Sequence, residues 1–179
     1  MESPFSTLDR SVVTAVTIEE VCGRLMAVRA GAVVALEGFC GSGKTTLAGQ
    51  VGKRVQMNVF HVDSFARKFD RPPAYTECLD LVRLHHALNG RAQTRPSIVE
   101  GICLRDVLLL VGIIPTTFIY LKRVGKNGLW YDGLNLMDFE EGHPAPGDSE
   151  EPHRSDLGYH RRVRPHETAD VVYERVMDD

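Results

Sequence analysis

An eight-residue stretch, Gly38 to Thr45, fits the pattern G-x-x-x-x-G-K-[ST], and the apolar run Ala32 to Leu36 leads directly into it. In such a loop, backbone N–H groups turn inward to hold phosphate oxygens, while the lysine reaches the terminal phosphates and the hydroxyl binds Mg²⁺. Glycines allow positive φ angles, and a helix that begins near Thr45 directs the positive end of its dipole at the anion. The stretch therefore predicts a site for a nucleoside triphosphate. The alternative is an ordinary glycine-rich turn.

Length and charge restrict the class of protein. The 179 residues fit one domain, residues 1–179, with a sizeable core. A net charge of −3 and a pI near 6.2 argue against nucleic acid and against a membrane as partner. The four cysteines form no C-x-x-C pair and the N-terminus has no apolar leader, which predicts a reduced, cytoplasmic protein. The longest apolar run, 107–114, is far shorter than the ~20 residues of a membrane span.

Hydrophobic runs alternate with helical patterns along most of the chain. A capping box at Thr17-Ile18-Glu19-Glu20 predicts a helix that ends near Gly31, and a second helix follows the loop to about Arg54. Further helices are expected at 75–88 and 104–111. Strands are expected at 32–37, 58–63, 97–101, 116–121 and 169–173. The uninterrupted apolar character of 32–37 is typical of a parallel strand covered on both faces.

Two segments lack this periodicity. Residues 1–16 are mixed in character and predict a loose N-terminal arm. Residues 138–156 contain seven acids against the single basic Arg154, and three prolines interrupt them. This composition predicts a mobile acidic loop.

Two acidic residues follow predicted strands. Asp63 ends the strand at 58–63, and Glu100 ends the strand at 97–101. In an open α/β sheet, ligands bind outside the carboxyl ends of the strands, so both acids are expected beside the phosphate loop. Asp63 could accept a proton from an attacking hydroxyl or hold a metal-bound water, and Glu100 could lie beside Mg²⁺. The alternatives are a turn aspartate and a strand-end glutamate that faces water.

Three arginines, Arg161, Arg162 and Arg164, occur within four residues after the acidic segment. Such a cluster is usually a solvated face. It could equally form a lid that closes over the γ-phosphate of a bound nucleotide. Similarly, Trp130 and Tyr131 could cover a ligand ring, although packing is the more common role of such a pair.

Four signals in this order resemble the uridine kinase and phosphoribulokinase-like P-loop kinases. They are the loop ending in G-S-G-K-T-T, Asp63-Ser64-Phe65, Val99-Glu100-Gly101-Ile102, and a late Arg-x-x-Pro-x-x-x-Ala-Asp-Val-Val. The resemblance covers roughly 32–123 and 157–175. It implies a three-layer P-loop NTPase fold of the α/β class, with a parallel sheet in the order 2-3-1-4-5 and helices on both faces. It also implies transfer of the γ-phosphate of ATP to a small-molecule hydroxyl.

The resemblance assigns roles residue by residue. Asp63 would be the general base, Lys44 would bind the β- and γ-phosphates, and Thr45 with Glu100 and Asp63 would hold Mg²⁺. Asp70 matches the position that holds sugar hydroxyls in nucleoside kinases. The phosphates of ATP would lie on the loop residues Gly38, Gly41, Ser42, Gly43, Lys44, Thr45 and Thr46.

The sequence departs from that family in two places. The insertion that walls the pyrimidine pocket of uridine kinases is missing between Gly90 and Ser97, and the usual lid arginines are not at their spacing. Arg123, Arg161, Arg162 and Arg164 are therefore the lid candidates, with Arg123 also a candidate substrate ligand. We predict an ATP-dependent kinase for a nucleoside or sugar-like acceptor, with a homo-oligomer left open. The alternative is a non-catalytic or regulatory nucleotide-binding protein.

Overall fold

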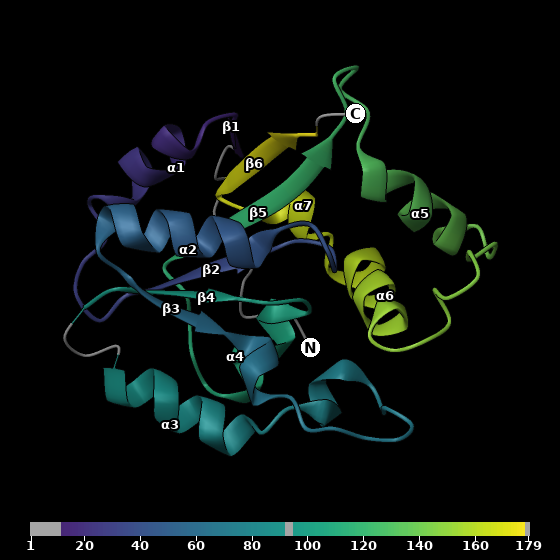
Figure 1. Ribbon diagram of the computed structural model, residues 1–179, viewed down its shortest axis with the longest axis horizontal. Helices are drawn as coiled ribbons and strands as arrows, with labels where there is room; N and C mark the ends of the chain where they lie inside the picture. Colours follow the sequence, from purple (N-terminus) through teal and green to yellow (C-terminus); the bar gives the residue numbers. More distant parts are fainter. Residues whose placement is uncertain (1–11, 92–94, 178–179) are drawn as a thin grey trace.

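The computed structural model describes residues 12–91 and 95–177. They form one six-stranded, entirely parallel sheet with helices on both faces (Figure 1). The strands are β1 (Val13–Ala15), β2 (Val33–Glu37), β3 (Asn58–His61), β4 (Ser97–Glu100), β5 (Thr117–Val124) and β6 (Val171–Val176), in the order β1-β6-β5-β2-β4-β3.

The expected fold class is confirmed, and the strand order differs in one detail. The five predicted strands lie as β3-β4-β2-β5-β6, which is the order 2-3-1-4-5. The sixth strand, β1, pairs with β6 at the sheet edge, where Val13 lies opposite Val171. The prediction of a loose arm over 1–16 is therefore wrong for Val13–Ala15, and its first eleven residues lie outside the described ones.

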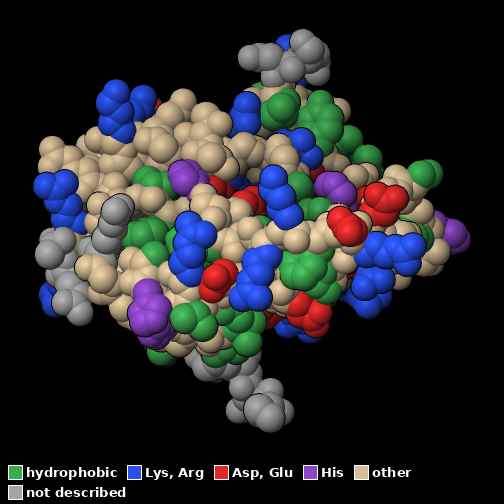
Figure 2. Space-filling model, turned by 60° about the horizontal axis from the view of Figure 1, so that its bottom comes forward, with side chains coloured by type: hydrophobic (Ala, Val, Ile, Leu, Met, Phe, Trp, Pro, Cys, Tyr) green, Lys and Arg blue, Asp and Glu red, His purple; other side chains and the backbone are tan. Residues whose placement is uncertain are grey.

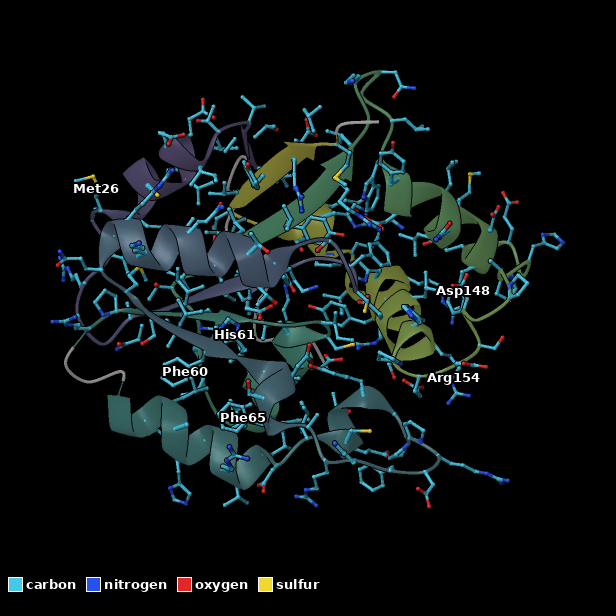
Figure 3. The ribbon with its side chains drawn as sticks, in the orientation of Figure 1. Met26, Phe60, His61, Phe65, Asp148 and Arg154 are labelled. Carbon is cyan, nitrogen blue, oxygen red and sulfur yellow. The ribbon has the colours of Figure 1, made fainter. Side chains whose placement is uncertain are left out.

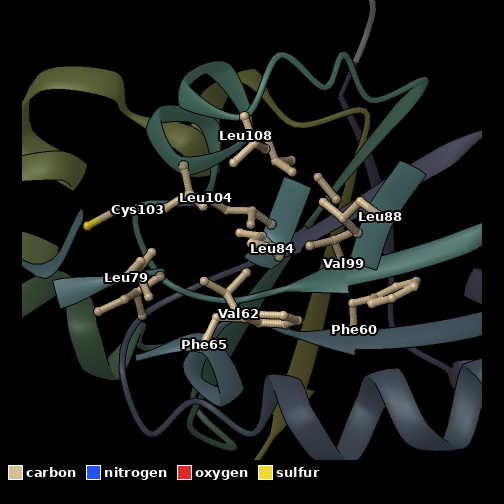
Figure 4. Close-up of a cluster of buried hydrophobic side chains, with 14 of the residues drawn as sticks. Phe60, Val62, Phe65, Leu79, Leu84, Leu88, Val99, Cys103, Leu104 and Leu108 are labelled. Carbon is tan, nitrogen blue, oxygen red and sulfur yellow. The ribbon is translucent and has the colours of Figure 1, made fainter. Parts of the chain in front are cut away.

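Alternate residues of β2 face two separate cores, as expected of a central parallel strand. Val34 and Leu36 belong to a cluster covered by α1 (Ile18–Leu25) and α2 (Lys44–Val55). Val33 and Ala35 belong to the opposite cluster, which α3 (Leu81–Arg91) and α4 (Leu104–Leu110) cover (Figure 4). The phosphate loop therefore leaves the sheet from a strand in which every residue is buried.

Two of the remaining helices, α5 (Tyr131–Glu140) and α6 (His153–Val163), lie beyond the carboxyl ends of the strands (Figure 1). The short α7 (Pro165–Thr168) leads into β6 and packs on β5. The predicted acidic loop at 138–156 is thus shorter than expected, because α5 includes Asp138–Glu140 and α6 begins at His153. The mobility of 141–152 stays a prediction.

Two other element boundaries differ from the predicted ones. The predicted helix at 75–88 is divided into a 3₁₀ turn, η2 (Tyr75–Cys78), and α3. Between them, the Arg67 N–H donates to the Cys78 carbonyl and the Asp80 N–H donates to the Phe65 carbonyl. The helix that begins after Thr17 has the predicted capping box but ends at Leu25 rather than near Gly31.

The surface of the described residues carries charges of both signs. On the face shown in Figure 2, basic side chains lie among acidic and apolar ones. Within 12–91 and 95–177, no helix has both the length and the apolar character required to cross a bilayer.

We expect Leu108→Ala to lower the free energy of unfolding by about 2–5 kcal/mol, because Leu108 is fully buried in the cluster of Figure 4 and its loss leaves a cavity. Leu109→Ala is the matched control, since the side chain of Leu109 is 53% exposed. Urea unfolding with an unchanged m value would measure both. Equal losses in the two variants would contradict this core.

We expect stability to fall as the pH is lowered from 6.5 towards 4. Burial against Tyr120 and Trp130 lowers the pKa of His166 from 6.5 to about 4. Because the unfolded chain then binds a proton that the folded chain does not, unfolding becomes more favourable across this window. His166→Phe should reduce this part of the pH dependence. Thermal unfolding at several pH values would test it, and an unchanged slope in the variant would refute the assignment.

Candidate active site

The loop Gly38 to Thr45 connects β2 to α2 in a conformation that its glycines make accessible. Gly38 has a φ of +155° and Gly43 a φ of +99°. A Cβ on Gly38 would lie 2.6 Å from the carbonyl oxygen of Leu121 on the neighbouring strand. Lys44 opens α2, and its Nζ donates to the Phe39 carbonyl at 2.7 Å. The amine is thus folded back over the loop, where an incoming phosphate would meet it.

A cleft of about 450 Å³ adjoins this loop. The loop, the segment after β3, the end of β4 and the residues just before α6 contribute its walls. The residues that line it and matter for chemistry are Gly41, Gly43, Lys44, Thr45, Asp63, Arg67, Tyr75, Glu100 and Glu151. The structure therefore brings together the predicted phosphate loop and both predicted acids.

Glu100 joins the loop to the neighbouring strand. Its carboxylate is 3% exposed and accepts a hydrogen bond from the Thr45 hydroxyl at 3.0 Å. The same oxygen accepts from His61 Nδ1 at 2.7 Å, so this ring nitrogen carries a hydrogen. Figure 3 shows His61 near the end of β3. A hydroxyl and a carboxylate at the end of the phosphate loop are hard oxygen ligands, which suit Mg²⁺ that is also held by nucleotide phosphates.

Asp63 lies in the 3₁₀ turn η1 (Val62–Phe65), directly after β3 rather than in the strand itself. The Tyr75 hydroxyl donates to Asp63 Oδ1 at 2.5 Å. Burial of the ring, followed by the negative charge of Asp63, raises the pKa of Tyr75 well above its ordinary value. The phenol therefore stays protonated as a donor and fixes the orientation of the carboxylate.

Only Lys44 and Arg67 are cationic among the described residues that line the cleft. The nearest acid to the Arg67 guanidinium is Asp80, at 3.9 Å, and the Arg67 side chain is 58% exposed. Its charge is thus only weakly neutralised. Arg67 follows Asp63 by four residues and is not among the site residues predicted from the sequence.

The predicted lid arginines do not line this cleft. The Arg161 guanidinium lies 5.2 Å from the centre of the Phe139 ring, and Arg162 pairs with Asp106 on α4. Arg123 pairs with Asp132 of α5 and lines a second cavity of about 240 Å³ on the other side of the loop. Arg164, the fourth lid candidate, pairs with Glu140 and Glu167. All four guanidinium groups therefore have partners outside the cleft.

Asp70 and Thr46, predicted as ligands of the sugar and the nucleotide, are exposed and do not line the cleft either. Ser42 is buried beneath the loop. Trp130 packs on Phe39 and Tyr120, which agrees with the packing alternative for this aromatic residue.

Sequence reasoning missed Arg175. Its Nη1 lies 3.3 Å from the Ser42 carbonyl and would lie 2.3 Å from a Cβ on Gly43. The parallel pairing of β5 and β6 places Arg175 opposite Arg123 at the carboxyl ends of the strands. That position relative to the loop is the signal that could have found it.

Comparison with solved structures agrees with this architecture. A possible uridine kinase from Bacillus stearothermophilus superposes with a TM-score of 0.57 at 16% sequence identity, covering 87% of this chain and 96% of its own. The chain has a three-layer P-loop NTPase fold. A candidate fructose transport system kinase from Silicibacter sp. TM1040 matches with a TM-score of 0.49 at 18% identity, over 89% of this chain and all of its own. No protein-family model and no curated protein matches the sequence.

In this P-loop NTPase fold, we expect Gly43→Ala to weaken binding of MgATP at least about tenfold. The added Cβ would be strained at a positive φ, and it would lie 2.3 Å from Nη1 of Arg175 on β6. Gly128→Ala is the matched control, because Gly128 has a φ of +78° with open space around it. Calorimetric titration would compare the two. Equal affinity in both variants would contradict a nucleotide site on this loop.

Proposed function

We propose that the protein is an ATP-dependent kinase that transfers the γ-phosphate to a hydroxyl of a nucleoside or sugar-like acceptor. The observation that supports it best is the shared cleft, in which Lys44 and Thr45 lie with both acids, Asp63 and Glu100. A phosphate loop alone would account only for nucleotide binding. An oriented carboxylate in the same cleft supplies a group that an acceptor hydroxyl needs.

In the proposed reaction, Asp63 accepts the proton of the acceptor hydroxyl as that oxygen forms a bond to the γ-phosphorus. The bond from the γ-phosphorus to the bridging oxygen breaks, and ADP leaves. Lys44 neutralises charge on the β- and γ-phosphates, and the N–H groups of the loop hold their oxygens. Thr45 and Glu100, with Asp63 directly or through water, would hold Mg²⁺, which supplies further charge neutralisation when bound.

The acceptor end of the cleft is compact and largely apolar. Pro72, Tyr75, Cys78 and Ile102 line it. A cleft of this size fits a small alcohol beside a terminal phosphate. Arg67 is the cationic side chain best placed to stabilise the transferring phosphoryl group or an anionic group on the acceptor, in place of the lid arginines.

A regulatory nucleotide-binding protein is the second candidate. The positions of Arg161 and Arg162 favour it, because neither lines the cleft and both already have partners. A protein of this kind would bind MgATP at the same loop without acceptor-dependent turnover.

We expect Lys44→Ala to abolish MgATP binding, and Asp63→Asn to keep binding within about threefold while turnover falls at least about a hundredfold. The difference follows because a base acts on the acceptor proton, whereas the lysine contacts the nucleotide. Nucleotide affinity would be measured by calorimetry. Turnover would be measured as ADP release across a panel of nucleosides, sugars and vitamin alcohols.

The results of these measurements distinguish the kinase from the regulatory nucleotide-binding protein. Acceptor-stimulated ADP release that depends on Asp63 supports the kinase. MgATP binding with no stimulation by any acceptor would favour the regulatory protein. Equal loss of binding in both variants would remove the support for Asp63 as the base.

A further inference from the structure

Helix α6 presents its polar residues in two directions. Asp156, Tyr159 and His160 are buried and face the phosphate loop and its strand, whereas Arg161 and Arg162 are exposed. The spacing of three and four residues places the buried group on one face of the helix. Figure 3 marks Arg154 in the first turn of this helix. The buried face, not the arginine-rich one, contacts the loop.

Asp156 makes the direct contact with the loop. Its Oδ2 accepts the backbone N–H of Cys40 at 2.7 Å, and the residue is 1% exposed. A hydrogen bond between a buried carboxylate and a backbone amide is stronger than one between neutral groups. The third residue of the loop is therefore anchored from outside the cleft.

His160 packs beside Asp156. His160 Nδ1 lies 2.8 Å from the backbone carbonyl of Asp156 and 3.1 Å from its Oδ1. Because a carbonyl can only accept, Nδ1 carries a hydrogen and donates it to that carbonyl, whereas Oδ1 makes no hydrogen bond among the described residues. On the other side of the ring, Tyr120 lies 3.1 Å from Nε2, and burial raises the pKa of Tyr120, so its hydroxyl stays protonated and can donate. Tyr120 and His160 therefore hold the backbone of Asp156, while its Oδ2 binds the Cys40 amide.

Two more contacts hold the flanking residues. The ring of His160 stacks on Phe39, with 3.6 Å between the ring centres. Tyr159 donates to Glu37 Oε2 at 2.5 Å, at the last position of β2. One helix thus contacts residues 37, 39 and 40, while Gly41, Gly43, Lys44 and Thr45, together with Cys40, line the cleft.

We propose that α6 holds the phosphate loop in its binding conformation and that Asp156 is the positioning residue. Without a bound anion, the inward N–H groups of such a loop have no acceptor, so an outer restraint reduces the conformational freedom lost on binding. This inference rests on the proposed binding of a nucleoside triphosphate. It assigns α6 a function that does not require its arginines to close over the ligand.

The test is calorimetric binding of a non-hydrolysable ATP analogue with Mg²⁺, combined with thermal unfolding. Asp156→Ala removes the acceptor of the Cys40 N–H, and we expect the affinity to fall at least tenfold, or about 1.4 kcal/mol. Asp156→Asn retains a carbonyl acceptor and should bind within about threefold of the wild type. An anchoring role therefore predicts rescue by the amide, which a general loss of stability does not.

Asp170→Ala is the matched control. Asp170 Oδ2 accepts the Phe118 N–H at 2.8 Å, which is the same kind of bond at the other end of the sheet. We expect this variant to lose stability and keep its affinity within about threefold. If Asp156→Ala does not fold, His160→Phe serves instead, because it retains a stacked ring but removes the Nδ1 hydrogen, and it should bind at least threefold more weakly.

The outcomes separate this inference from the proposed function. No binding of the analogue by the wild type would overturn the proposed function itself. Normal wild-type binding with unchanged affinity in Asp156→Ala, or in His160→Phe where the first variant does not fold, would overturn the positioning role. Equal losses in Asp156→Ala and Asp156→Asn, or in Asp156→Ala and Asp170→Ala, would also overturn it.

Discussion

The buried carboxylate of Glu37 is the contact on which the geometry of this molecule depends. It is the last residue of β2, and it accepts from Arg105 Nε at 2.9 Å and from the Tyr159 hydroxyl at 2.5 Å. These partners belong to α4 and α6, so one carboxylate ties the central strand to two helices at the start of the phosphate loop. Removing Arg105 would leave the charge of Glu37 buried without compensation, which is among the costlier changes a core can undergo.

This contact has further support from its surroundings. The Arg105 guanidinium also lies 4.3 Å from the centre of the Phe118 ring on β5. Burial, then the charge of Glu37, raises the pKa of Tyr159, which therefore remains a donor. The start of the loop is consequently fixed by groups that do not line the cleft.

Much of the fold could be predicted from the sequence, because hydrophobic runs, the capping box at Thr17 and the phosphate loop are local signals. The wrong predictions occur where residues that are distant in the sequence determine the local structure. Val13–Ala15 becomes a strand because the edge of β6 is available, and no pattern within three residues could show that. The predicted helix at 75–88 is divided because its backbone groups bond to Phe65 and Arg67 instead of to one another.

The residues of the candidate site also fall into two groups, those with a local sequence signal and those whose position depends on distant partners. Asp63 and Glu100 could be located from the sequence, because parallel strands bring their carboxyl ends to one edge. The positions of Arg161 and Arg162 could not be predicted, because they depend on which face of α6 contacts the loop. The spacing of Asp156, Tyr159 and His160 contains that information, but only once the neighbour of the helix is known.

The two ends of the cleft are built from different kinds of structure. The side that holds the phosphate loop consists of strand ends and the loop, whereas Arg67, Tyr75 and Glu151 on the other side belong to segments between the sheet strands and the long helices, with Tyr75 in the 3₁₀ turn η2. Connections tolerate substitution, insertion and deletion more readily than a central sheet does. Under the proposed function, chains with the same phosphate loop would therefore diverge in the alcohols they select while their sheets stay superposable.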